Sequence, residues 1–166
     1  MKRFCLIAVL FCFLQGCSHA GNDDFTAGDL RAMDHVTGRD INWFSVNGYR
    51  VPRLGGGYCC IMLPMKWFPG MQAKIEWETS PEITEKVPGY NHREEFLAWE
   101  NKSRASYRKH NAIVDVPEYG KSRCGMSVHF LPCNQVKVTT TCVGYGTPNY
   151  PIKEPMNMPE PEVCPG

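Results

Sequence analysis

The sequence has no apolar run long enough to cross a bilayer as an ordinary transmembrane helix. Its N-terminal run, residues 4–14, holds eleven residues, whereas a spanning helix needs about 20. The sequence also has no large excess of positive or negative charge, because it contains 18 basic and 17 acidic residues and its net charge is +1. A nucleic-acid-binding protein needs a concentrated basic surface, so this balance argues against a nucleic-acid partner.

Motifs of phosphate binding and catalysis are missing as well. Three glycines stand together at residues 55–57, but neither G-x-G-x-x-G nor the lysine–serine of a P-loop is present. The sequence also lacks a G-x-S-x-G nucleophile motif and a C-x-x-C redox motif. Ser127 and His129 stand two apart in an expected strand, where we expect them on a solvent face. These absences predict a protein that is not an enzyme and uses neither a cofactor nor a metal.

The N-terminal sequence predicts a lipoprotein signal peptide over residues 1–16. Lys2 and Arg3 precede the apolar run, and residues 14–17 read Leu-Gln-Gly-Cys. This resembles the bacterial lipobox, in which the cysteine receives a diacylglycerol on its thiol and an acyl chain on its freed amine. Two or more acyl chains hold a protein firmly at a membrane. We therefore expect Cys17 to be lipidated and to begin the mature protein.

The position after the lipidated cysteine indicates the membrane. Ser18 stands there instead of the aspartate that resembles an inner-membrane retention signal. The expected location is therefore the periplasmic side of the outer membrane, with the inner membrane as the alternative.

The mature chain divides into three predicted parts. Residues 17–30 are expected to be a polar membrane tether, residues 31–152 a single β-rich domain, and residues 153–166 a Pro-rich tail tied only through Cys164. Loss of the signal peptide removes Lys2 and Arg3, which leaves 16 basic residues against 17 acidic ones. The mature protein is thus close to neutral.

Six cysteines remain once the signal peptide and Cys17 are set aside. They are Cys59, Cys60, Cys124, Cys133, Cys142 and Cys164. An even number in an oxidising compartment predicts disulfides, with 15 connectivities open, and hairpin register suggests the pair Cys124 and Cys142. Adjacent residues of an extended strand point to opposite faces. Cys59 and Cys60 are therefore expected to have different partners, with a bond between them as the alternative.

Alternation of apolar and polar residues predicts a mainly β fold. In residues 71–78, Ala73, Ile75 and Trp77 lie on one face and charged residues on the other. Further strands are expected within residues 41–48, 58–64, 111–120, 124–132 and 135–143. The first of these ends in the turn signal Asn47–Gly48, and the last two are expected to be joined by a turn at Cys133–Asn134. Residues 92–107 have helical spacing, and their aromatic residues Phe96 and Trp99 are expected in the core. The predicted fold is an antiparallel, sandwich-like domain with one helix, reinforced by disulfides, with α+β as the alternative.

Several segments resemble, in order, an uncharacterised family of small bacterial lipoproteins. They are INWFSVNGY, GGGYCCIMLPMKWFPG, KIEWE, AIVDVPEYG, VHFLPCNQVKV and YGTPNYP, and the resemblance covers about residues 34–150. The most specific element is CC-x₃-P-x₂-W-x-PG at residues 59–70. Members are typically encoded beside type VI secretion phospholipase effectors. The resemblance implies an immunity protein that occludes a toxic lipase in the periplasm.

An immunity protein implies two partners, a secreted phospholipase and, through the lipid anchor, a membrane. Protein interfaces centre on aromatic anchors, and Trp67 and Phe68 are candidates because they precede the Pro69–Gly70 turn. The alternative for Trp67 is packing under the loop. Two other functions stay open: a structural or envelope-assembly lipoprotein without a toxin partner, and a hydrolase too divergent to show its motifs.

The lipobox gives a direct prediction. In the wild type, mass spectrometry of the N-terminal peptide should find an acylated Cys17, and the protein should fractionate with membranes. Cys17→Ser removes the acceptor thiol, so the variant should lose both the acyl mass and membrane retention. A Cys17→Ser variant that stays in the membrane with an unchanged N-terminal peptide would show that residue 17 is not the anchor.

Overall fold

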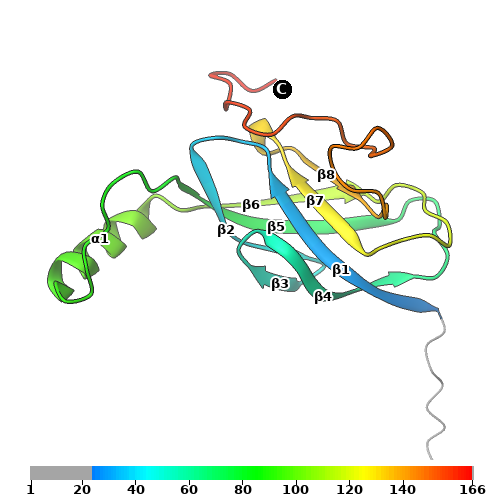
Figure 1. Cartoon of the computed structure of the whole chain (residues 1–166), viewed down its shortest axis with the longest axis horizontal. Helices are drawn as coiled ribbons and strands as arrows, with labels where there is room; N and C mark the ends of the chain where they lie inside the picture. Colours follow the sequence, from blue (N-terminus) through cyan, green and yellow to red (C-terminus); the bar gives the residue numbers. More distant parts are fainter. Residues whose placement is uncertain (1–23, 166) are drawn as a thin grey trace, which may run out of the picture.

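The structure, a computed structural model, describes residues 24–165 as two four-stranded sheets packed face to face (Figure 1). One sheet has the strand order β4-β1-β7-β8 and the other the order β3-β2-β5-β6. The strands are β1 (Phe25–Asp34), β2 (Arg39–Val46), β3 (Tyr49–Pro52), β4 (Gly55–Pro64), β5 (Gln72–Pro81), β6 (Arg108–Asp115), β7 (Met126–Phe130) and β8 (Val136–Thr139). One α-helix, α1 (Arg93–Ala105), and a 3₁₀ turn, η1 (Pro132–Asn134), complete the chain.

This architecture confirms the predicted fold class, a mainly β, sandwich-like domain with one helix and paired cysteines. The predicted signal peptide, Cys17 and the first part of the tether lie outside the described residues. Among residues 24–165, no helix is long and apolar enough to cross a membrane.

Side-chain alternation builds the core between the two sheets. Along β5, Ala73, Ile75 and Trp77 are buried while the charged residues between them are not. The Trp77 ring lies 5.3 Å from the Phe130 ring of the opposite sheet, measured between centroids, and Phe44 lies 5.9 Å from the same ring. Burial of such large aromatic surfaces is the main term that stabilises the sandwich.

β1 was not predicted, since its residues were assigned partly to the tether. The strand begins at Phe25, pairs antiparallel with β4 and pairs parallel with β7. The tether prediction is therefore wrong for residues 25–30. The parallel pair also makes this sheet mixed, whereas the sequence predicted antiparallel pairing throughout.

Glycine allows β1 and β7 to approach closely where their pairing begins. A Cβ atom at Gly125 would overlap the backbone of Asp29, and one at Gly28 would lie 2.5 Å from the Cα atom of Gly125. Gly125 also has a φ of 87°, in the left-handed region that side chains disfavour. The backbone of β1 thus packs directly on the residue that leads into β7.

The turn signals of the sequence are confirmed in two hairpins. Asn47 and Gly48 both have positive φ between β2 and β3, as a two-residue Asn-Gly hairpin turn requires. Cys133 and Asn134 also have positive φ, and they lie in the turn that joins β7 to β8. The short strand β3 itself was missed, because only four residues form it.

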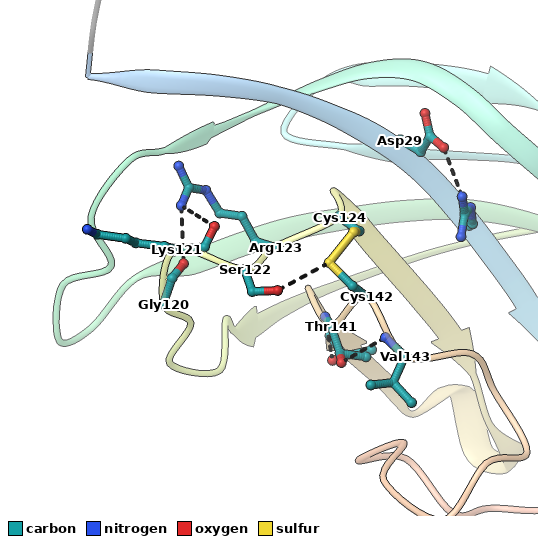
Figure 2. Close-up of a disulfide and its surroundings, with 11 residues drawn as sticks. Asp29, Gly120, Lys121, Ser122, Arg123, Cys124, Thr141, Cys142 and Val143 are labelled. Carbon is teal, nitrogen blue, oxygen red and sulfur yellow. Dashed lines mark hydrogen bonds and ion pairs between the residues drawn. A yellow bond between two sulfur atoms is a disulfide. The ribbon is translucent and has the colours of Figure 1, made fainter.

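The six described cysteines form three pairs. Cys124 pairs with Cys142, with their Cα atoms 4.9 Å apart (Figure 2), and this confirms the pairing inferred from hairpin register. Cys133 pairs with Cys164 at a Cα separation of 5.4 Å. Cys59 pairs with its neighbour Cys60, so the prediction of different partners is wrong. That prediction assumed the alternation of an ordinary strand.

The C-terminal segment is docked at more points than its cysteine. Met158 forms a bridge to Val36 after the end of β1, and its N–H donates to the carbonyl of His35 at 2.6 Å. The Thr37 N–H donates to the carbonyl of Met158 at 2.9 Å. The expectation that the tail is tied only through Cys164 is therefore wrong.

Candidate functional site

A buried polar cluster lies on the face of β7 that points away from the core. Met126, Val128 and Phe130 face the opposite sheet, so the residues between them point outward. His129 is nevertheless 0% exposed, because the C-terminal segment covers it. The prediction that it lies on a solvent face is wrong.

The hydrogen bonds of this cluster run in one direction when both histidines are neutral. The Nδ1 atom of His35 lies 3.0 Å from the carbonyl of Pro155, which can only accept, so this nitrogen carries the proton. Nε2 of His35 then accepts from Nδ1 of His129 at 2.7 Å. Nε2 of His129 is left to accept from the Tyr150 hydroxyl at 2.6 Å. Every nitrogen of the two rings is thus occupied.

Burial sets the proton affinities in this cluster. It lowers the pKa of His129 from 6.5 to about 4, with a further lowering by His35 and a partial offset by Glu154. Burial also raises the pKa of Tyr150, while the Ser127 hydroxyl acts in the opposite direction. His35, His129 and Tyr150 are all buried and bonded to one another or to the tail. The arrangement fastens the C-terminal segment to the sheet.

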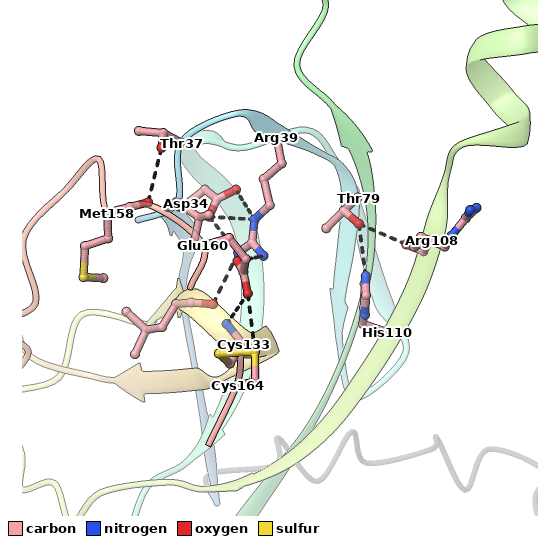
Figure 3. A network of polar contacts seen from close by, with 12 residues as sticks. Asp34, Thr37, Arg39, Thr79, Arg108, His110, Cys133, Met158, Glu160 and Cys164 are labelled. Carbon is pink, nitrogen blue, oxygen red and sulfur yellow. Dashed lines mark hydrogen bonds and ion pairs between the residues drawn. A yellow bond between two sulfur atoms is a disulfide. The ribbon is translucent and has the colours of Figure 1, made fainter. Parts of the chain in front are cut away.

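A second set of polar contacts fastens the same segment further along (Figure 3). Arg39 donates to the Asp34 carboxylate at 2.9 Å and lies 3.6 Å from Glu160 of the tail. Glu160 also accepts from the N–H of Cys133 at 2.6 Å. Cys133, Glu160 and Cys164 come close enough to share a metal ion. The two sulfurs are joined in a disulfide, however, so they offer no thiolate ligands.

The two predicted partner-binding residues differ in their surroundings. Trp67 is partly buried, and its indole Nε1 donates to the carbonyl of Val116 at 2.8 Å. It therefore packs under its loop, as the alternative interpretation held. Phe68 is 51% exposed and leaves a ring available for contact.

Several exposed apolar residues lie on the segment that connects β5 to β6. We call this segment, residues 82–107, the α1 arm. β5 and β6 pair with each other along their length, so the arm is an insertion between neighbouring strands. It projects from one end of the sandwich (Figure 1), and α1 buries none of its residues. Its large apolar residues Ile83, Val87, Tyr90 and Leu97 are exposed, and Tyr90 is 84% exposed.

Aromatic residues hold the α1 arm together internally. The Tyr90 and Phe96 ring centroids lie 4.7 Å apart, and those of Phe96 and Trp99 lie 5.8 Å apart. Glu85 lies 4.0 Å from Lys102, which links the loop to the helix. The prediction that Phe96 and Trp99 face the core is wrong, because the helix never reaches the sandwich core.

The prediction of a core helix overlooked the amino-acid composition of this segment. Six of the thirteen residues of α1 are charged, which leaves only a narrow apolar face. Glu94 and Glu95 begin the helix and Lys102 and Arg104 end it, which matches the helix dipole. Charges at its ends and contacts with the preceding loop therefore support the helix in place of the core.

These features define a small, disulfide-reinforced β-sandwich that carries the α1 arm, with its exposed apolar residues, at one end. Residues 33–138 match the family described as "Protein of unknown function (DUF3304)", and the chain belongs to this family. The match includes the α1 arm and the loop with Trp67 and Phe68. No curated protein matches the chain. No solved structure matches it either.

The buried histidine gives a prediction about pH. Because the pKa of His129 is about 4 in the folded protein and 6.5 ordinarily, the unfolded chain binds more protons between these values. The stabilisation is fully present above pH 6.5 and falls by at most about 3 kcal/mol as the pH drops towards 4. Urea unfolding across this range should show the loss, and NMR should place the His129 titration below pH 5.

Two variants separate His129 from the other titrating groups. His129→Gln cannot titrate, so its free energy of unfolding should change less over the same pH range. His92 is exposed, and His92→Asn should keep the wild-type slope. A wild-type slope in His129→Gln, or a His129 titration near 6.5, would contradict the assignment.

Proposed function

We propose that this protein is a lipid-anchored, periplasm-facing immunity protein that binds and neutralises a type VI secretion phospholipase effector. The proposal joins the family resemblance of the sequence to one structural observation, the α1 arm. In this proposal the protein acts by occupying the lipase and performs no catalysis of its own.

The α1 arm has the properties of a partner-binding element. A helix that projects into solvent with exposed apolar residues gains nothing for the core of its own protein, whereas exposed apolar patches commonly mark interaction sites. Tyr90 and Leu97 suit the role of anchors, since tyrosine is enriched among the residues that dominate binding energies. An amphipathic helix that enters a groove of its partner is a recurrent mode of recognition.

Inhibition of a lipase by occlusion needs a broad continuous surface, so one contact cannot include both ends of the sandwich. Stable protein interfaces bury at least about 1,200 Å² in total. Phe68 lies on the loop between β4 and β5, at the opposite end of the sandwich from the arm in Figure 1. We therefore assign the lipase contact to the α1 arm and its flanking loop, and not to Trp67 and Phe68.

The lipid anchor supports the same function. A lipidated Cys17 would hold the inhibitor at the membrane whose phospholipids the effector attacks, which raises its local concentration there. The β1 end of the sandwich follows the tether, and the α1 arm extends at the far end (Figure 1). The arm would thus reach into the periplasm, where an incoming lipase is met. We propose the outer membrane as the location, with the inner membrane as the alternative.

Coexpression tests this proposal. The neighbouring lipase, directed to the periplasm, should kill cells that lack this protein and spare those that make it. A double variant, Tyr90→Ser with Leu97→Ser, should lose protection and weaken the complex at least about 30-fold, as expected for loss of about 2 kcal/mol at a binding hot spot. The matched control is Ile113→Ser, since Ile113 is also exposed but lies on β6.

Purified proteins give the second measurement. The wild type should abolish lipase activity near a one-to-one ratio, whereas the double variant should not. Equal killing with and without the protein, together with no complex in solution, would reject the immunity function and favour a structural or envelope-assembly lipoprotein. Full inhibition by the double variant would move the contact away from the arm.

A further inference from the structure

Exposed apolar residues gather at the end of the sandwich where β1 begins. Phe25 opens β1, Met62 lies on β4, and Met65 and Phe68 lie on the loop that follows; all four are exposed. Together with the basic residues Lys66, Lys121 and Arg123 they make up what we call the N-terminal patch. Soluble proteins rarely leave several large apolar side chains together in water without a partner.

Specific contacts build this patch around the first residues of β1. Phe25 pairs with Pro64 in the β1–β4 ladder, and the N–H of Met65 donates to the carbonyl of Asp24 at 2.6 Å. Arg123 lies with its Nη2 atom 2.8 Å from the sulfur of Met65. The loop after β4 and the segment before β7 therefore meet at the point where the chain enters the domain.

The basic residues of the patch lie at its rim. Figure 2 shows Lys121 and Arg123 next to each other on the segment that leads into β7. Arg123 donates to the carbonyl of Gly120 at 3.1 Å, which holds its guanidinium near the patch. Lys66 and Lys121 are exposed. The acidic residues near these segments are Asp24, Glu118 and, at the end of β6, Asp115, which bonds to Gln72.

The length of the tether decides what can cover this patch. Seven residues, 18–24, separate the lipidated Cys17 from Phe25. Even a fully extended chain of this length spans no more than about 25 Å. The domain therefore cannot move far from the bilayer, and the end that bears the N-terminal patch is the end nearest to it.

We propose that the N-terminal patch rests on the surface of an anionic phospholipid bilayer. Phenylalanine and methionine side chains enter the boundary between headgroups and acyl chains, while lysines reach the phosphates with their ammonium groups. Lys66, Lys121 and Arg123 match the negative potential of such a surface. This inference rests on the lipid anchor of the proposed function but not on the lipase as partner.

Contact with the bilayer would fix the orientation of the whole molecule. The α1 arm lies at the opposite end of the long axis from the N-terminal patch (Figure 1). A domain seated on the patch would hold the arm away from the lipid and open to a protein partner. A domain that swings freely on its tether would instead expose every face to lipid and to protein alike.

Photocrosslinking in vesicles tests the proposal on the full lipidated protein. Benzoylphenylalanine replaces Phe68 in one sample and, as matched controls, Tyr90 or Ile113 in others. The protein is reconstituted in vesicles of phosphatidylethanolamine and phosphatidylglycerol and irradiated. Lipid adducts should form at residue 68 with a yield several-fold above that at residue 90 or 113. Equal yields at the three positions would overturn the proposal.

Charge reversal tests the basic rim. Lys66→Glu with Lys121→Glu should lower the adduct yield at residue 68 by at least about twofold in these vesicles. Lys102→Glu with Lys109→Glu, on α1 and at the start of β6, should leave it unchanged, and neutral phosphatidylcholine vesicles should remove the difference between the two variants. If neither charge-reversal variant changes the adduct yield at residue 68, the proposed specificity for anionic lipid is wrong.

The same samples separate this inference from the proposed function. If the lipase is not inhibited but residue 68 still crosslinks to lipid, the membrane contact stands and the immunity function falls. If the N-terminal peptide carries no acyl chains, the anchor is wrong and the membrane contact falls with it.

Discussion

The close approach of β1 to β7 is the constraint on which the rest of the structure depends. It requires glycine at residues 28 and 125, since a Cβ atom at Gly28 would overlap the backbone of Gly125, just before β7, and one at Gly125 would overlap the backbone of Asp29 in β1. Through this contact the first strand of the domain becomes an interior strand of its sheet, paired on both sides. The chain is thereby part of the sandwich from Phe25 onward.

β1 also connects the two ends of the molecule. Its first residue belongs to the N-terminal patch, and the residues after its last one, His35 and Val36, hold the C-terminal segment. Hydrogen bonds of His35 and His129, the Asp34–Arg39 pair and the Cys133–Cys164 disulfide act on the same segment. The tail is thus a third layer over the sheet, outside the core that the two sheets enclose.

Local patterns in the sequence predicted the elements that depend on local chemistry. The alternation along β5, the hairpin turns at Asn47–Gly48 and Cys133–Asn134, and the Cys124–Cys142 pair all follow from neighbouring residues or from one turn. The fold class followed from the same signals. Features that depend on distant segments were missed, because nothing in a short window records them.

β1 and His129 illustrate two ways in which prediction from the sequence failed. β1 contains Gly28 and Asp29 and lacks clean alternation, and its parallel partner lies far along the chain. His129 lies at an outward-facing position in the alternation of β7, yet the C-terminal segment covers it. For the candidate site, Phe68, which the sequence analysis named as a partner-binding candidate, is exposed. The helix expected in the core instead forms the exposed α1 arm.

In our proposals the two ends of the sandwich make different contacts: lipid at the N-terminal patch and a lipase at the α1 arm. Hydrogen–deuterium exchange of the lipidated protein tests this division directly, measured in detergent, in anionic vesicles, and in vesicles with the purified lipase. Vesicles should slow exchange in residues 62–70 and not in the arm, and the lipase should then slow exchange in residues 83–105. Protection of the arm by vesicles alone, or protection of residues 62–70 only when the lipase is added, would contradict the account.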